Sequence, residues 1–214
     1  MSSIDTGEEY IETLPDLSNF DTLAIGPGLD TREVTVKMVG KLLDSWKYPV
    51  IIDADGLNAI KDDVDILSKR KKKTIITPHP GEMSKLSGLM INSIQDNRDT
   101  ISQEFSQKWK VILVLKGYHT VISHYDGRTV LNMTGGPALA TAGTGDVLLG
   151  TIAAFWSDNL KKPFDATATA VYLHGLAGDV AAEKFGEKSV IASDVVEILP
   201  EVIKIAQEKI DNKD

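Results

Sequence analysis

Short apolar runs alternate with longer amphipathic segments along the first half of this chain. Four runs rich in β-branched residues have the length and composition of buried strands, at 22–25, 49–53, 74–77 and 111–115. Segments with helical spacing lie between them, at 32–46, 57–68, 81–87 and 94–109. Such an order needs crossover connections between parallel strands. We therefore predict an α/β fold with a mostly parallel central sheet.

The pattern changes in the second half of the chain. Residues 120–124 and 129–133 flank Asp126-Gly127, a dipeptide suited to a tight turn, which predicts an antiparallel edge hairpin. The last third is predicted to be helical at 145–156, 165–185 and 193–210, with Pro200 kinking or restarting the final helix.

Charge and composition exclude several classes of function. With 31 acidic and 23 basic residues, and a formal net charge of −8, the chain lacks the clustered positive charge that nucleic acids attract. The short basic run at 69–73 is typical of a solvated helix end. Cysteine is absent, which excludes disulfides and thiolate chemistry, and the sequence contains neither a membrane-spanning apolar stretch nor a secretory leader. We expect a cytoplasmic protein that binds neither nucleic acid nor membranes.

Length and the N-terminal residues set the expected domain organisation. At 214 residues the chain fits one ordinary domain. Residues 1–20 are polar, where a doubly wound sheet normally has its opening strand. We therefore predict a single domain over residues 1–214 that is N-terminally incomplete.

A glycine-rich segment at 134–150, TGGPALATAGTGDVLLG, is the strongest functional signal. Its glycines precede an apolar helix, whose free N–H groups and dipole favour an anionic phosphate. It lacks the Gly-Lys-Ser/Thr of a Walker loop, and Leu148 replaces the last glycine of G-x-G-x-x-G. Asp146, at the start of the helix, is the predicted catalytic carboxylate, since it can accept a proton from a substrate hydroxyl beside the phosphate. The alternatives are that the glycines only pack a helix against a strand and that Asp146 is only an N-cap.

Three further segments follow predicted strands: 26–29 (GPGL), 77–82 (TPHPGE) and 116–120 (KGYHT). Ligands of open α/β sheets lie beyond the carboxyl ends of the strands, so these loops are expected at one rim. Taken singly, His79 is also typical of a turn, and Lys116 of a solvated strand end. Turn or cap roles are favoured for Asp53, Asp55 and Asn58. A packing and polar network is favoured for His174 with Asp179.

Six segments in order resemble the NAD(P)H-hydrate dehydratase family. They are VIIDADGLN (50–58), TIITPHPGEMSKL (74–86), VLKGYHTVI (114–122), the glycine-rich segment, LHGLAGDVAA (173–182) and IASDVVEILP (191–200). The resemblance runs from about Phe20 to the C-terminus. It implies the ribokinase-like three-layer α/β/α fold. It also implies ADP- or ATP-dependent dehydration of the S form of NADH or NADPH hydrate (NADHX, NADPHX) with Mg²⁺, by phosphorylation of the ring hydroxyl and elimination of phosphate.

The resemblance also implies residue roles. Gly26, Gly28, His79 and Asp146 would contact the hydrate. Lys116, Gly117, Tyr118, His119, Thr120 and Gly145 would hold the adenine nucleotide. The backbone of Gly143, Thr144 and Gly145 would stabilise charge on the transferring phosphate. Glu82 is similar to the glutamate of the Asn-x-x-Glu element through which ribokinase-like kinases organise magnesium.

The sequence departs from the family in several places. Family members usually carry a further N-terminal segment with a Gly/Ser-rich strand-to-helix loop, and Gly136 and Leu139 stand where Asn and Met are common. The resemblance further implies a homo-oligomer, taken as a tetramer, and a functional link to an NAD(P)H-hydrate epimerase. Two other functions fit the same residues: a ribokinase-like kinase for a small alcohol such as a vitamin precursor, and a non-catalytic nucleotide-binding module.

Overall fold

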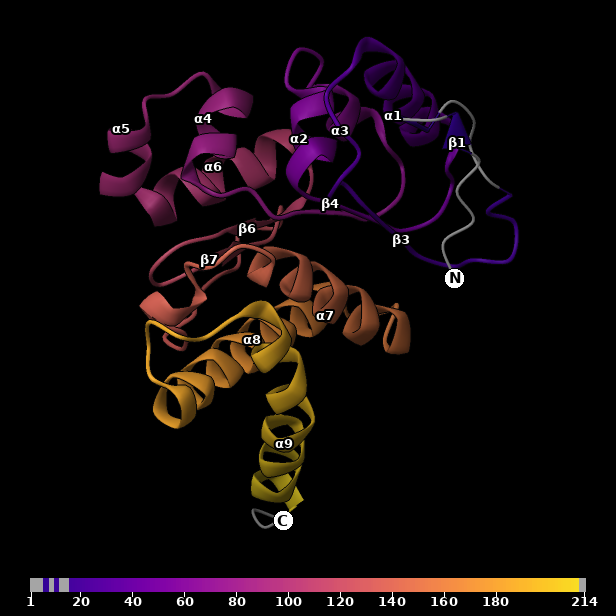
Figure 1. Ribbon diagram of the computed structural model, residues 1–214. Helices are drawn as coiled ribbons and strands as arrows, with labels where there is room; N and C mark the ends of the chain where they lie inside the picture. Colours follow the sequence, from indigo (N-terminus) through magenta and orange to yellow (C-terminus); the bar gives the residue numbers. More distant parts are fainter. Residues whose placement is uncertain (1–5, 8–9, 12–15, 212–214) are drawn as a thin grey trace. The chain divides into compact units, whose positions relative to one another are not determined.

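A computed structural model describes residues 6–7, 10–11 and 16–211 of the chain (Figure 1). Packing divides the chain into two compact units. The first comprises Met1–Gly117 with Val121–Val130, and the second comprises Tyr118–Thr120 with Leu131–Asp214. No helix within the described ranges combines the length and the apolar character needed to cross a bilayer.

A six-stranded sheet, in the order β3-β4-β5-β6-β7-β8, organises the first unit. Its strands are β3 (Leu23–Ile25), β4 (Val50–Ile52), β5 (Thr74–Ile76), β6 (Ile112–Leu115), β7 (Val121–Ser123) and β8 (Thr129–Leu131). Strands β3 to β6 are parallel, and β7 is antiparallel to β6, with Leu115 opposite Val121. The mostly parallel sheet with its edge hairpin is thereby confirmed. Two short strands, β1 (Thr6–Gly7) and β2 (Tyr10–Ile11), form a separate antiparallel pair that the sequence did not predict.

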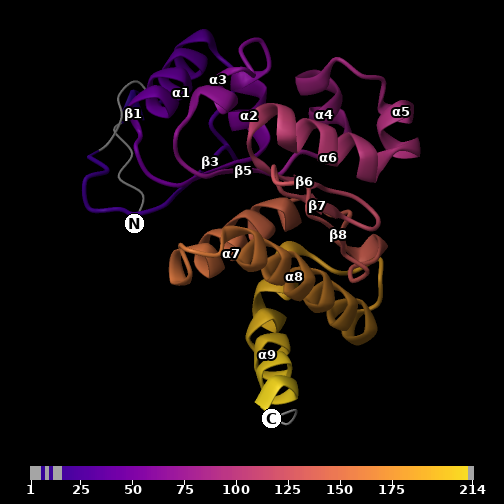
Figure 2. The ribbon, with the colours of Figure 1, turned by 180° about the vertical axis from the view of Figure 1, so that it is seen from behind.

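The helices of the first unit lie on one side of this sheet in both views (Figures 1 and 2). They are α1 (Glu33–Ser45), α2 (Ala54–Ile60), α3 (Ile66–Lys69), α4 (Pro80–Ser87), α5 (Ile91–Asp96) and α6 (Arg98–Trp109). Neighbouring parallel strands follow one another in sequence across the sheet, so right-handed crossovers place every connecting helix on the same face. Because β3 to β6 are parallel, their carboxyl ends lie at one edge of the sheet.

Two segments that were predicted as single helices are each divided into two helices, so these predictions were wrong. The segment at 57–68 is divided into α2, which starts earlier at Ala54, and α3. Asp62, Asp63 and Asp65 lie between them, and aspartate side chains favour turns and caps over helix interiors. The segment at 94–109 is divided into α5 and α6 at Asn97, whose φ of −136° is not helical.

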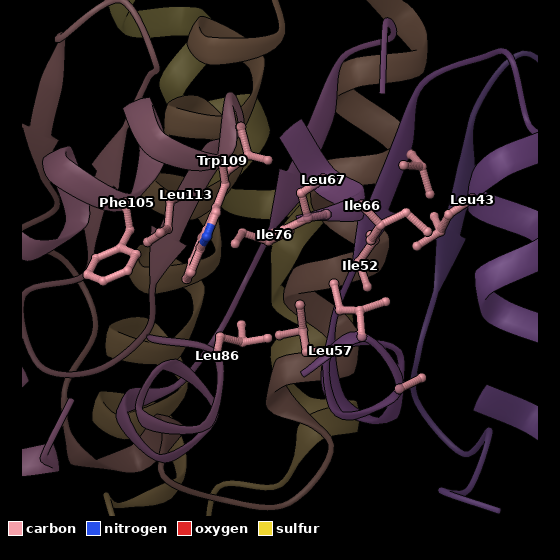
Figure 3. Packing of buried hydrophobic residues seen from close by; sticks show 14 of the residues in the cluster. Leu43, Ile52, Leu57, Ile66, Leu67, Ile76, Leu86, Phe105, Trp109 and Leu113 are labelled. Atoms are coloured by element: carbon pink, nitrogen blue, oxygen red, sulfur yellow. The ribbon is translucent and has the colours of Figure 1, made fainter. Parts of the chain in front are cut away.

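The core of the first unit fills the space between the sheet and these helices (Figure 3). Ile52, Ile76 and Leu113 point from adjacent strands into it and are completely buried. Phe105 and Trp109 of α6 pack with their ring centroids 4.7 Å apart. Strand residues that alternate with these, such as Ile51, Ile75 and Ile112, are also buried, as is typical of parallel strands. This packing fixes the strand ends from which the loops emerge.

The second unit is helical. It contains the short 3₁₀ helix η1 (Pro137–Leu139), α7 (Thr144–Asp158), α8 (Pro163–Phe185) and α9 (Ala192–Asp211). Apolar residues repeat every third or fourth position on the facing sides of the last two helices: Leu173, Ala177 and Ala181 on α8, and Val195, Ile198 and Val202 on α9. Pro200 lies inside α9, which continues through it as one helix, so of the two predicted effects, a kink or a restart, the restart is excluded.

Candidate active site

The ends of β3 and β4 touch through Gly26. Gly26 has a φ of +145°, and a Cβ at this position would lie 1.8 Å from the carbonyl oxygen of Asp53. The N–H of Asp53 in turn donates to the carbonyl oxygen of Ile25 at 3.0 Å. Gly28, with a φ of +72°, completes the left-handed turn after β3. Only glycine allows the two backbones to approach so closely.

Lys116, the first residue after β6, joins three strand ends. Its Nζ lies 2.6 Å from Asp53 Oδ1 and 3.8 Å from Glu82 Oε2. The side chains of Asp53 and Glu82 are 2% and 8% exposed, so the two carboxylates share one cation largely out of solvent. The loops that follow β4, β5 and β6 therefore meet at one edge, as the strand topology predicts.

His79 caps helix α4 through a reciprocal arrangement with Glu82. His79 Nδ1 accepts from the N–H groups of Gly81 at 2.9 Å and Glu82 at 3.3 Å. The N–H of His79 donates to Glu82 Oε2 at 2.7 Å, which completes a capping box with Pro80 at the first helical position. Because Nδ1 is an acceptor, the neutral ring carries its proton on Nε2. The ring is half-exposed, so Nε2–H is available as a donor.

The acidic groups fit a magnesium ion carried by a nucleotide better than a site made of protein alone. Among the described residues, no three His, Cys, Asp or Glu side chains gather as metal ligands. Mg²⁺ usually takes one or two carboxylates together with phosphate oxygens and water. Glu82 could contribute one carboxylate, since its Oε2 lies 3.8 Å from Lys116 Nζ, whereas Asp53 Oδ1 pairs with the same ammonium group at 2.6 Å.

Asp53 is the residue at this edge whose role was missed. Asp55 Oδ2 accepts from the N–H of Asp30 at 3.0 Å, a contact with the loop after β3 and not the turn or cap bond that the sequence favoured. Asp53 precedes α2 but makes no side-chain cap bond, and its carboxylate pairs with Lys116 instead. One signal was present in the sequence: a carboxylate directly after the apolar run of β4 is poorly solvated and needs a cation.

The glycine-rich segment forms the start of α7 in the second unit. Gly143 is the N-cap with a φ of +87°, and Asp146 is the third helical residue, with an exposed side chain. The Thr144 hydroxyl lies 2.7 Å and 2.8 Å from the carbonyl oxygens of Leu139 and Thr141, so it binds the backbone. The N–H of Gly145 has no acceptor within the part of the chain that the structure describes. A free donor and a carboxylate thus lie on the same helical turn.

Helix α8 holds the loop that precedes α7. Asp179 Oδ2 accepts from the N–H of Gly135 at 2.9 Å, and the Thr134 hydroxyl donates to the carbonyl oxygen of Tyr172 at 2.8 Å. A Cβ on Gly175 would lie 2.2 Å from Thr134 Oγ1. A Cβ on Gly178, the next glycine of α8, would lie 2.6 Å from the Leu139 side chain. The LHGLAGDVAA segment therefore packs closely against the glycine-rich loop.

His174 on α8 contacts the first turn of α7. Its Nε2 lies 2.9 Å from the carbonyl oxygen of Thr144, and the side chain is buried. Burial lowers the pKa of His174 to about 4, so the neutral ring donates from Nε2 near pH 7. The acceptor belongs to the peptide group that carries the N–H of Gly145, so this bond orients that donor. His174 and Asp179 have the expected polar role, but His174 binds the backbone of the first turn of α7 and Asp179 that of the loop before it.

We expect acid to destabilise the protein through His174. Its native pKa of about 4 is below the ordinary 6.5, so between these pH values the unfolded chain binds a proton that the native state does not. Stability contributed by the neutral ring is complete above pH 6.5 and is lost on acidification by about 1 kcal/mol per pH unit. Urea unfolding from pH 7 to 4 measures this dependence. A His174→Gln variant, which keeps a donor but does not titrate, should lose less stability on acidification; equal slopes would contradict the assignment.

The segment after Gly117 presents aromatic rings to solvent. Tyr118 and His119 stack with ring centroids 3.9 Å apart, and Tyr118 is 75% exposed. His119 has a φ of +55°, which turns the chain sharply at this point. Flat aromatic surfaces of this kind can stack on a planar base.

Known structures identify the class of protein that this fold defines. The crystal structure of a ribokinase-like superfamily protein from Enterococcus faecalis V583 matches 86% of this chain and 63% of its own, with a TM-score of 0.73 and 29% identity. An ADP/ATP-dependent NAD(P)H-hydrate dehydratase from Bacillus subtilis, co-crystallized with ATP/Mg²⁺, matches 86% of this chain and 64% of its own, with a TM-score of 0.76 and 35% identity. The chain thus has the ribokinase-like α/β fold.

Sequence comparison narrows this class to one family. The model of the NAD(P)H-hydrate dehydratase family matches residues 3–201. The bifunctional NAD(P)H-hydrate repair enzyme Nnr of Moorella thermoacetica is 42% identical over 195 residues, which are 91% of this chain and 37% of that protein. This chain belongs to the NAD(P)H-hydrate dehydratase family, as the order of its motifs predicts. It spans well under half the length of the Moorella relative.

Proposed function

We propose that this chain catalyses the ADP- or ATP-dependent dehydration of (6S)-NADHX and (6S)-NADPHX to NADH and NADPH. The observation that carries the proposal is the start of α7, where Gly145 offers a free N–H and Asp146 an exposed carboxylate one residue later. A nucleotide-dependent reaction at a hydroxyl group needs both a phosphate-binding donor and a proton acceptor. The names of the Moorella and Bacillus relatives support the same chemistry.

The proposed reaction has two stages. In the first stage, the oxygen of the ring hydroxyl attacks the terminal phosphate of ADP or ATP, while Asp146 accepts the hydroxyl proton. This step releases AMP from ADP, or ADP from ATP. The N–H of Gly145, with the backbone of Gly143 and Thr144, stabilises the negative charge on the transferring phosphate. The lone pair of the ring nitrogen then expels phosphate and forms an iminium. The carbon next to the one that carried the phosphate loses a proton to solvent, which forms the ring double bond of dihydronicotinamide and returns the electron pair to nitrogen.

The remaining predicted site residues keep the roles that the family resemblance implies. Gly26, Gly28 and His79 would bind the hydrate, with His79 donating from Nε2. The loop of residues 116–120 would bind the nucleotide, with Tyr118 and His119 offering an aromatic surface to adenine. Glu82 would hold Mg²⁺, which when bound neutralises charge on the nucleotide phosphates.

The proposal extends to assembly and context. We propose that residues 1–214 act as one functional domain of a cytoplasmic homo-oligomer, taken as a tetramer, and that its activity is linked to an NAD(P)H-hydrate epimerase. Exposed apolar side chains on the helical unit, including Tyr172, Ile191 and Val196, support self-association. The bifunctional repair enzymes among the relatives support the epimerase link. Light scattering coupled to size-exclusion chromatography tests the assembly.

The direct test is recovery of dihydronicotinamide absorbance from NADH hydrate with Mg²⁺ and ADP or ATP. We expect recovery with stoichiometric release of inorganic phosphate. A stable phosphorylated product would instead identify a kinase, and the same assay on small alcohols would find its substrate. Nucleotide binding without turnover of any hydrate would identify a non-catalytic module and contradict the proposal.

A further inference from the structure

The guanidinium of Arg98 binds the end of β6. Its Nη2 donates to the carbonyl oxygen of Leu115 at 2.7 Å and to that of Lys116 at 3.2 Å. Its Nη1 donates to Gln95 Oε1 at 2.7 Å. Arg98 opens α6 and Gln95 belongs to α5, so one side chain connects both helices to the strand end.

Gly117 lies against the same guanidinium. A Cβ on Gly117 would be 3.1 Å from Nη1 and 3.2 Å from Nη2 of Arg98, and the φ of Gly117 is +140°. The backbone thus leaves β6 directly beside the guanidinium, in a conformation that favours glycine. Any side chain at this position would push Arg98 away from the carbonyl groups that it binds.

Residue 116 is therefore held at two points. Arg98 binds its carbonyl oxygen, while Asp53 and Glu82 hold its ammonium group. Two buried carboxylates and one arginine from separate elements fix the residue that opens the 116–120 loop. Fixing a loop in its binding conformation before the ligand arrives reduces the entropy lost on binding.

Arg98 also carries a positive charge that no acidic side chain neutralises within the described ranges. Partial burial lowers the pKa of Arg98 from its ordinary value, but a guanidinium stays protonated at physiological pH. Its partners are two carbonyl groups and one amide oxygen. These bonds direct the charged guanidinium at the end of β6.

We propose that Arg98 is a positioning residue for the adenine nucleotide, which acts by holding the backbone of Lys116 and Gly117. This inference rests on the proposed function, because it assumes that the 116–120 loop binds ADP or ATP. Arg98 need not touch the nucleotide. Its Nη2 donates to both carbonyl oxygens while its Nη1 donates to Gln95, and lysine, with one nitrogen on a shorter side chain, cannot make both sets of bonds at once.

The test is calorimetric titration of Arg98→Ala and Arg98→Lys with ADP. We expect the Kd for ADP to rise about tenfold in both variants, since each loses the paired bonds to the loop. In the hydrate assay the KM for nucleotide should rise, while kcat and the KM for hydrate stay near wild type. Arg98→Lys with wild-type affinity would assign the effect to charge alone and overturn the positioning role.

Arg70 provides the matched control. It is also a half-buried arginine whose guanidinium donates to two carbonyl oxygens, those of Leu43 and Tyr48, and to Thr74 at the opposite end of β5. We expect Arg70→Lys to lower the urea midpoint as much as Arg98→Lys does, without changing the Kd for ADP. If Arg70→Lys and Arg98→Lys lost affinity for ADP equally, Arg98 would have only a structural role, and the positioning role would be overturned. Absence of ADP binding by the wild-type protein would overturn the proposed function together with this inference.

Discussion

Replacing Asp146 with asparagine should lower kcat for hydrate dehydration by about 100-fold to 10,000-fold, the range that general-base groups usually contribute. Asparagine keeps the shape of the side chain but cannot accept the hydroxyl proton. Asp146 is exposed at the third position of α7, so the substitution removes no buried contact. The Kd for ADP should therefore stay close to wild type. Single-turnover assays with NADH hydrate, alongside titration with ADP, measure the two quantities separately.

Asp158 supplies the control for this substitution. It is an exposed aspartate at the other end of the same helix. Asp158→Asn makes an identical chemical change and should leave kcat unaltered. If Asp146→Asn retained more than about a tenth of the wild-type rate, the assignment of Asp146 as the proton acceptor would be wrong.

Replacing Gly26 with alanine should produce the largest loss of stability, more than about 3 kcal/mol in the free energy of unfolding. The added methyl group would collide with the carbonyl oxygen of Asp53 at 1.8 Å, and this oxygen cannot rotate away as a side chain would. A φ of +145° is also unfavourable for any residue with a Cβ. Urea unfolding followed by circular dichroism measures the change.

The matched substitution is Gly40→Ala in the interior of α1. A Cβ on Gly40 meets nothing within 4 Å, and alanine is the better helix former. We expect a gain of about 0.5 to 1 kcal/mol at this position. A Gly26→Ala variant as stable as wild type would show that the ends of β3 and β4 separate without cost.

The strands β3 to β6 and the start of α7 were predictable because their signals are local. Apolar β-branched runs define β3 to β6, and clustered glycines before an apolar segment define a helix N-terminus. The breaks in two helices were missed because apolar spacing continues across the aspartates at 62–65 and across Asn97. Periodicity alone does not report whether a turn interrupts it.

The site contacts that were missed depend on residues distant in the sequence. Asp53 and Lys116 are 63 positions apart, and Arg98 reaches the end of the following strand. The glycines of α8 look like ordinary helix interruptions until the loop that they accommodate is placed beside them. Which polar groups lie at the strand ends follows from topology, whereas their pairing depends on side-chain distances.

Helix α8 contacts the glycine-rich loop through Tyr172, Gly175, Gly178 and Asp179, and contacts the start of α7 through His174. These five residues occupy little more than two turns of one helix. A rotation of α8 by a single residue would break all of these contacts at once. We therefore expect the glycine-rich loop and the first turn of α7 to open together with α8, since an opening that breaks the bond from His174 to the Thr144 carbonyl oxygen also releases the N–H of Gly145 from its fixed direction.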